Sequence, residues 1–181
     1  MIGQVVQAVS CEMLETLKKV DSDIRTINYQ YGPAAQLKET LKQFDEDRSK
    51  CYEKYPLIFL VTPFVEKEGD GPGSYRRAMP KIGIAHHTTD DLKSSERYER
   101  SFRKVLLPLY DCFIEQLLAS GYFPVRSERD LKLSRSIRDD IGRRPFLNIS
   151  GASSDYIDGI EITNIELPII QTSCCMSGDF H

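Results

Sequence analysis

The sequence predicts an α+β fold in which a small antiparallel sheet packs against helices. Two β-prone runs flank a glycine-rich turn, a third lies near the C-terminus, and three segments space their apolar residues as helices do. The expected order is helix, helix, strand, strand, helix, a long arm and a last strand. Because the first two strands form a hairpin, this order favours α+β over a doubly wound parallel sheet.

The chain of 181 residues suits one domain. We expect that domain over residues 1–170, with an inserted extended arm at about 124–155 and a frayed C-terminal tail at 171–181. Hydrophobic residues make up 40% and charged residues 28%, which is enough for a core and is typical of a soluble protein. The net charge of −3 gives no general basic footprint for nucleic acid.

Two helices are predicted in the first part of the chain. The first covers residues 2–20, with an apolar face made of Ile2, Val5, Val6, Val9, Met13, Leu17 and Val20. The second follows a short apolar stretch and has Pro33 in its first turn, where a missing N–H is tolerated. Its narrow apolar face consists of Ala34, Leu37, Leu41 and Phe44.

A hairpin is predicted next. Residues 55–64 form a continuous apolar, β-prone run, and Pro63 indicates that this strand ends at or near a sheet edge. Residues 66–74 read as a glycine-rich turn. Residues 79–87 then read as a strand in which Ile82 and Ile84 share one face, to which His86 also belongs by its spacing.

The third helix has the strongest apolar pattern in the chain. Thr89 or Ser94 is the expected cap, and Gly121 is the expected stop. Pro108 lies inside the helical pattern and predicts a kink, or a break one turn earlier. The apolar face contains Phe102, Val105, Leu106, Leu109, Phe113 and Leu117.

The last strand is expected over residues 157–170. Ile160 and Ile162 share one face, whereas Ile165, Leu167 and Ile169 have the opposite parity. A bulge near Thr163 and Asn164 would bring both sets to the same side.

The cysteines and the N-terminus indicate a reducing compartment. The chain has 5 cysteines, without CxxC spacing, and its N-terminus lacks the features of a signal peptide. The longest apolar run, residues 56–65, is too short to span a bilayer. We therefore expect free thiols, assembly in the cytoplasm and no membrane partner.

No catalytic or metal centre is predicted, and neither is a cofactor. His86 and His87 are adjacent, and on a strand they would point to opposite faces instead of chelating one ion. Cys11 and Cys112 lack a nearby base, and the glycines of residues 68–73 lack the lysine of a phosphate-binding loop. A small hydrolase built on two carboxylates is the enzyme alternative, although no cleft marks its site.

The arm carries most of the candidate site residues. Its basic side chains recur at short spacing and are Arg126, Arg129, Lys132, Arg135, Arg138, Arg143 and Arg144. Two interpretations stay open: an arm that contacts partner subunits or phosphate, and a solvated loop of mixed charge. If the arm reaches a partner, deleting residues 126–144 should impair assembly and leave the core folded.

Three segments resemble one known family. They are KYPLIFLVTPFVEKEG, ERYERSFRKVLLPLYDCFIEQLL and DYIDGIEITNIELPI. These runs are similar to neck and tail-terminator-like ring proteins of tailed bacteriophages that infect Bacteroidetes, including crAss-like phages. The matching positions are Arg97, Tyr98, Phe102, Leu106, Pro108 and Tyr110, then Asp155, Asp158, Ile160 and Ile162. The arm departs from the family pattern, because it lacks the aromatic Trp-Gly segment.

The resemblance implies a virion structural protein and no enzyme activity. It would form a closed homo-oligomeric ring, six- or twelve-fold, at the head–tail junction, between portal or connector proteins and tail proteins. Genomic DNA would pass through the lumen without specific binding. The expected location is the neck or tail region of the virion, after assembly in the host cytoplasm. A structural adaptor of a tail-like contractile injection particle is the alternative assembly role.

Overall fold

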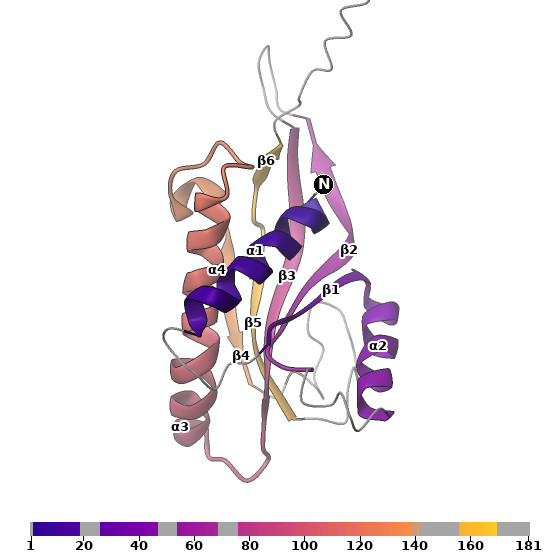
Figure 1. The fold of residues 1–181 in the computed structure, drawn as a ribbon, viewed down its shortest axis with the longest axis vertical. Coiled ribbons are helices and arrows are strands. Elements are labelled where there is room, and N and C mark those ends of the chain that lie inside the picture. Colours follow the sequence, from indigo (N-terminus) through magenta and orange to yellow (C-terminus); the bar gives the residue numbers. More distant parts are fainter. Residues whose placement is uncertain are drawn as a thin grey trace, which may run out of the picture.

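The computed structural model describes residues 2–18, 26–46, 54–68, 76–139, 141 and 156–169. In this part of the chain a mixed sheet of six strands has the order β1-β2-β3-β5-β4, and β6 pairs with β3 (Figure 1). The elements are α1 (Ile2–Leu17), β1 (Asn28–Pro33), α2 (Ala34–Glu46), β2 (Leu57–Lys67), β3 (Arg76–Thr88), α3 (Ser94–Arg97), the π-helix η2 (Tyr98–Leu106), α4 (Leu107–Ala119), the 3₁₀ helix η3 (Glu128–Leu131), β4 (Ser134–Arg138), β5 (Tyr156–Thr163) and β6 (Leu167–Ile169). The predicted α+β class is confirmed.

The sheet has a buried apolar layer on each face. Ile58, Leu60, Ile82, Ile84, Ile160 and Ile162 belong to the main core with α1, η2 and α4. Leu57, Phe59, Val61, Ala85 and Ile157 face the other way and pack with Leu37 and Leu41 of α2. Alternation along β2 thus sends successive residues to two different cores.

The expectation of a purely antiparallel sheet is wrong at one edge. β1 pairs in parallel with β2, from Asn28 opposite Leu57 to Pro33 opposite Thr62. Ile27, Tyr29 and Tyr31 alternate with polar residues, but the alternation is short and ends at Gly32 and Pro33, and five of the six β1 residues are partly buried or exposed. Pro33 closes this strand, and α2 begins at the next residue rather than at the proline.

The β2–β3 hairpin is confirmed, and both strands are longer than expected. Their antiparallel register is interrupted between Val61 and Val65, which is where Pro63 lies. The strand does not end at Pro63. It continues to Lys67 beyond the irregularity, because a bulge accommodates the residue that cannot donate to the ladder. Residues 69–75, most of the predicted turn, lie outside the described residues.

Pro108 changes the winding of the third helix. The nine residues of η2 precede α4, and the Leu107 N–H donates to the Phe102 carbonyl, five residues back. A π-helical stretch makes such wider turns, and it leads into the first turn of α4, where Pro108 needs no N–H partner. The predicted disturbance is therefore present, as a widening of the turns.

The ends of this helical segment are set by a carboxylate and a glycine. Glu96 accepts a hydrogen bond from the Lys93 backbone N–H at 3.1 Å, so the segment begins after Lys93 rather than at a Thr89 or Ser94 cap. Gly121 has a φ of +70°, in the left-handed region that ends many helices. The predicted stop at Gly121 is confirmed.

The predicted bulge in the last strand is also confirmed. Asn164 has a φ of +57° between β5 and β6. Ile162, Ile165 and Leu167 are all 0% exposed, although their spacing changes parity. One left-handed residue thus returns the chain to the same core.

Candidate subunit interface

The described half of the predicted arm is folded onto the sheet. Residues 128–131 form η3, and residues 134–138 form β4, which pairs antiparallel with β5. Leu131 is fully buried in the main core. Residues 124–139 are therefore not an extended arm, and deleting 126–144 would remove core material. Residues 140 and 142–155 lie outside the described residues.

The basic residues of this segment fold back onto their own subunit. Lys132 Nζ lies 3.2 Å from Glu166, and Arg138 Nε lies 3.0 Å from Glu161. The Arg135 guanidinium sits over the Tyr110 ring at 4.7 Å.

The remaining predicted site residues are not gathered into one site. Arg126, which precedes η3, and Arg129, which lies within it, are both exposed. Arg143 and Arg144 lie outside the described residues. The near three-residue spacing of these cations thus does not produce a continuous phosphate-binding surface in the described segment.

The contact at Tyr110 fixes β4 and η3 against α4. The Tyr110 hydroxyl donates to Glu128, and its ring carries the Arg135 cation. Burial, followed by the hydrogen bond to Glu128, raises the pKa of Tyr110. The phenol is therefore neutral at physiological pH and remains a donor.

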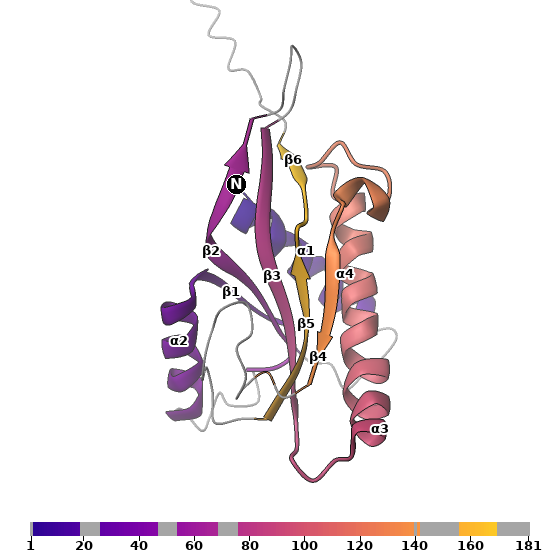
Figure 2. The ribbon, with the colours of Figure 1, turned by 180° about the vertical axis from the view of Figure 1, so that it is seen from behind.

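Both lateral edges of the sheet end in a strand that carries an exposed apolar side chain. β4 lies at one edge and β1 at the other, beside α2 (Figure 2). Ile137 on β4 is 45% exposed, and Tyr31 on β1 is 52% exposed. Edge strands present unpaired backbone groups, and large apolar side chains there favour contact with another chain.

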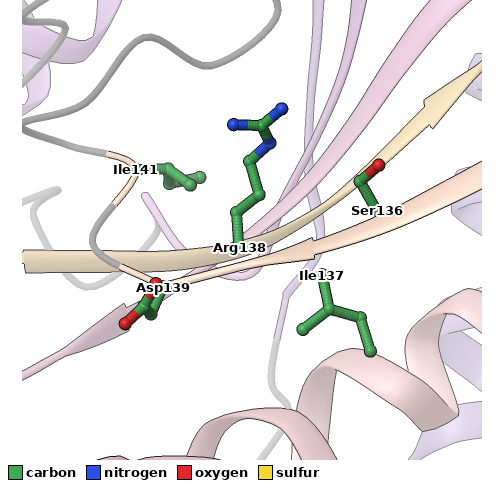
Figure 3. Close-up of a pocket in the computed structure, with 5 residues that line it drawn as sticks. All are labelled: Ser136, Ile137, Arg138, Asp139 and Ile141. Carbon is green, nitrogen blue, oxygen red and sulfur yellow. The ribbon is translucent and has the colours of Figure 1, made fainter.

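A pocket opens along β4. Its lining residues are Ser136, Ile137, Arg138, Asp139 and Ile141. Figure 3 shows Ile137 pointing toward the neighbouring helix and Arg138 pointing to the other side of the strand. Arg138 is engaged by Glu161, and among the lining residues that the structure describes Asp139 is the one carboxylate. The described lining therefore does not provide the pair of titratable groups that an acid–base centre needs, and its mixed apolar and charged residues are more typical of a protein interface.

A buried polar cluster lies beneath α3 and η2. His86 and Asp158 are opposite each other on β3 and β5, and Arg97 Nη1 lies 3.6 Å from Asp158 Oδ1. Arg97 Nη2 also donates to the Thr89 carbonyl at 3.2 Å. Burial, followed by the charge of His87, lowers the pKa of His86 to about 4. His86 is therefore neutral at pH 7.

Sequence reasoning missed this cluster. The spacing of His86 placed it on the face of Ile82 and Ile84, but no pattern in the sequence indicated the pairing of Arg97 with Asp158. Asp158 is 0% exposed, and the Arg97 side chain is 11% exposed. A buried ion pair without a solvent-exposed nucleophile is typical of a structural clamp.

Neither a metal cluster nor a membrane-spanning helix is found in the described part. Among the described residues, no group of three or more His, Cys, Asp and Glu side chains is arranged to hold a metal ion. His87 is exposed and its ring is tilted against that of Tyr55, at 6.1 Å between ring centroids, whereas His86 is opposite Asp158. No helix in the described ranges is long and apolar enough to cross a bilayer.

The fold and these surfaces define an α+β protein with an open mixed sheet and a structural ion pair beneath its long helical segment. Comparisons with family models, with curated proteins and with solved structures found no match.

Proposed function

We propose that this chain is a virion structural protein that forms a homo-oligomeric ring at the head–tail junction, as a neck, connector or tail-terminator protein. The ring joins the portal or connector to the tail and leaves a channel for DNA. The resemblance of the three segments named above motivates the location. Contacts within the fold support the assembly role.

The observation that carries the assembly role is that, in the described part of the chain, β1 and β4 each have one side without a further paired strand. An isolated subunit exposes Ile137 at one edge and Tyr31 at the other. Val65 is 57% exposed on the part of β2 that extends beyond β1 (Figure 1). Exposed apolar side chains on strands are a liability for a monomer and are covered when subunits associate.

The charge distribution supports a channel that DNA traverses without being held. The chain has a net charge of −3, and Lys132 and Arg138 are paired with carboxylates of the same subunit. Tight phosphate binding depends on several cations that release counterions together. A weakly charged wall lets DNA pass, whereas a dense cationic wall would retain it.

Electron microscopy of the purified chain, alone and mixed with the portal and connector proteins encoded beside it, tests this proposal. The expected result is closed rings that stack coaxially on the connector. If rings assemble only with components of a contractile injection particle, the protein is a structural adaptor of such a particle. A stable monomer that hydrolyses a substrate would refute the structural role.

A further inference from the structure

The directions of the strands relate the two open edges to each other. β1 runs parallel to β2, and β2, β3, β5 and β4 alternate in direction. β4 is therefore antiparallel to β1. If a second copy stands beside the first in the same orientation, its β1 meets β4 of the first in the antiparallel sense. Antiparallel strands form slightly stronger ladders than parallel ones.

The exposed apolar residues of the two edges lie on the same face of the sheet. Ile137 is opposite Ile160, and Tyr31 is opposite Leu60. Ile160 and Leu60 both belong to the core under α1 and α4. Residues directly opposite each other on paired strands share a face, so a sheet continued from one copy to the next would place Ile137 and Tyr31 on the same face, and a register that sets them opposite each other would bring them into contact.

The two arginine side chains of β4 do not project across the edge of the strand. Charged residues often protect an edge strand by projecting across it. Here Arg135 is held over Tyr110 and Arg138 is held by Glu161, so both cations are directed back to their own subunit. At the other edge, the Tyr31 ring packs on Gly3 of α1: a Cβ added there would lie 3.2 Å from the ring.

The geometry points to a head-to-tail interface in which β4 of one copy pairs antiparallel with β1 of the next, with Ile137 buried against Tyr31 of that neighbour. This inference rests on the proposed ring and specifies how its subunits join. The contact uses two different surfaces of the chain. Repeated by a rotation that divides a full turn evenly, such a heterologous contact closes into a ring, whereas other rotations give an open filament.

Variants that introduce opposite charges at Ile137 and Tyr31 test the interface. Light scattering after size exclusion measures the mass of the assembly. Ile137→Lys alone and Tyr31→Glu alone should each convert the assembly to monomers at a concentration where the wild-type chain is assembled. The double variant should regain the assembled mass at low salt and lose it at high salt, because the new pair is ionic. Tyr122→Lys is the control, since Tyr122 is 54% exposed and lies on neither edge strand.

The outcomes separate this interface from the ring itself. If both single variants keep the wild-type mass, or if Tyr122→Lys dissociates the assembly equally, the interface is refuted and the ring stands. Failure of the double variant to reassemble also refutes it. A wild-type chain that is monomeric at every concentration refutes the ring as well. Far-UV circular dichroism checks folding, and Ile137→Ser and Tyr31→Ser replace any charged variant that unfolds, with weakened assembly expected.

Discussion

Arg97 of α3 lies 3.6 Å from Asp158 of β5, and this ion pair is almost closed to solvent. It connects the beginning of the long helical segment to a central strand of the sheet. The same helical segment contains an ion pair of the opposite kind, Glu99 with Arg103 at 3.0 Å, in which both side chains are more than half exposed.

These two pairs give a matched comparison of stability. Asp158→Ala leaves the Arg97 guanidinium buried with one fewer acceptor and should lower the free energy of unfolding by about 3 kcal/mol. Glu99→Ala removes a screened surface pair and should cost no more than about 0.5 kcal/mol. Urea denaturation of both variants measures the difference. Equal costs would contradict the role of Asp158 as a clamp.

His86 should make stability depend on pH. Its pKa in the folded chain is about 4, below the ordinary value of 6.5, so the unfolded chain binds more protons between these values. The contribution of neutral His86 to the free energy of unfolding is therefore complete above pH 6.5. As the pH falls from 6.5 to 4, the free energy of unfolding decreases by up to about 3 kcal/mol. Denaturation at pH 7 and 4.5, wild type against His86→Asn, measures this component. If an NMR titration of the folded chain gives His86 its ordinary pKa, this pH dependence is refuted.

The Phe59 ring lies so close to Gly83 that it leaves no space for a side chain there. These residues are opposite each other on β3 and β2, and a Cβ at Gly83 would lie 2.2 Å from the Phe59 ring. Phe59 is buried beneath α2 and has little space to move. Gly83→Ala should therefore cost about 1–3 kcal/mol. Thermal denaturation measures the loss, and Phe59→Leu in the Gly83→Ala background should recover part of it.

Gly121 has a different constraint. A Cβ at this position would have nothing within 4 Å, but the φ of +70° disfavours any residue with a side chain. Gly121→Ala should cost about 1 kcal/mol, and Gly121→Asn should cost less because asparagine tolerates this conformation better. Thermal denaturation of the two variants gives the order. A reversed order would argue against backbone conformation as the cause.

Elements with a strong period could be predicted from sequence, whereas polar strands could not. α1, the β2–β3 hairpin and α4 carry continuous or periodic apolar residues, and the parity change at Asn164 indicated the bulge. β1 and β4 carry mostly partly buried or exposed residues, so the sequence indicated only a short apolar stretch at β1 and an arm at β4. Their strand character comes from pairing with β2 and β5, which is a tertiary effect.

The candidate interface shows the same division. The cations of β4 were visible in the sequence, but their partners Glu161 and Glu166 are distant along the chain and are brought close by the sheet. Ile137 attracted no notice because one isoleucine among charged residues has no period. Its exposure at a sheet edge required the structure.

The mass of the purified wild-type chain, measured across a wide range of concentration, decides whether the chain assembles into a ring. Multi-angle light scattering should give one discrete multiple of the subunit mass, stable on dilution to micromolar concentration and consistent with a closed ring. A single subunit mass at every concentration, with Ile137 and Tyr31 solvent-exposed throughout, would show that the chain does not form a ring.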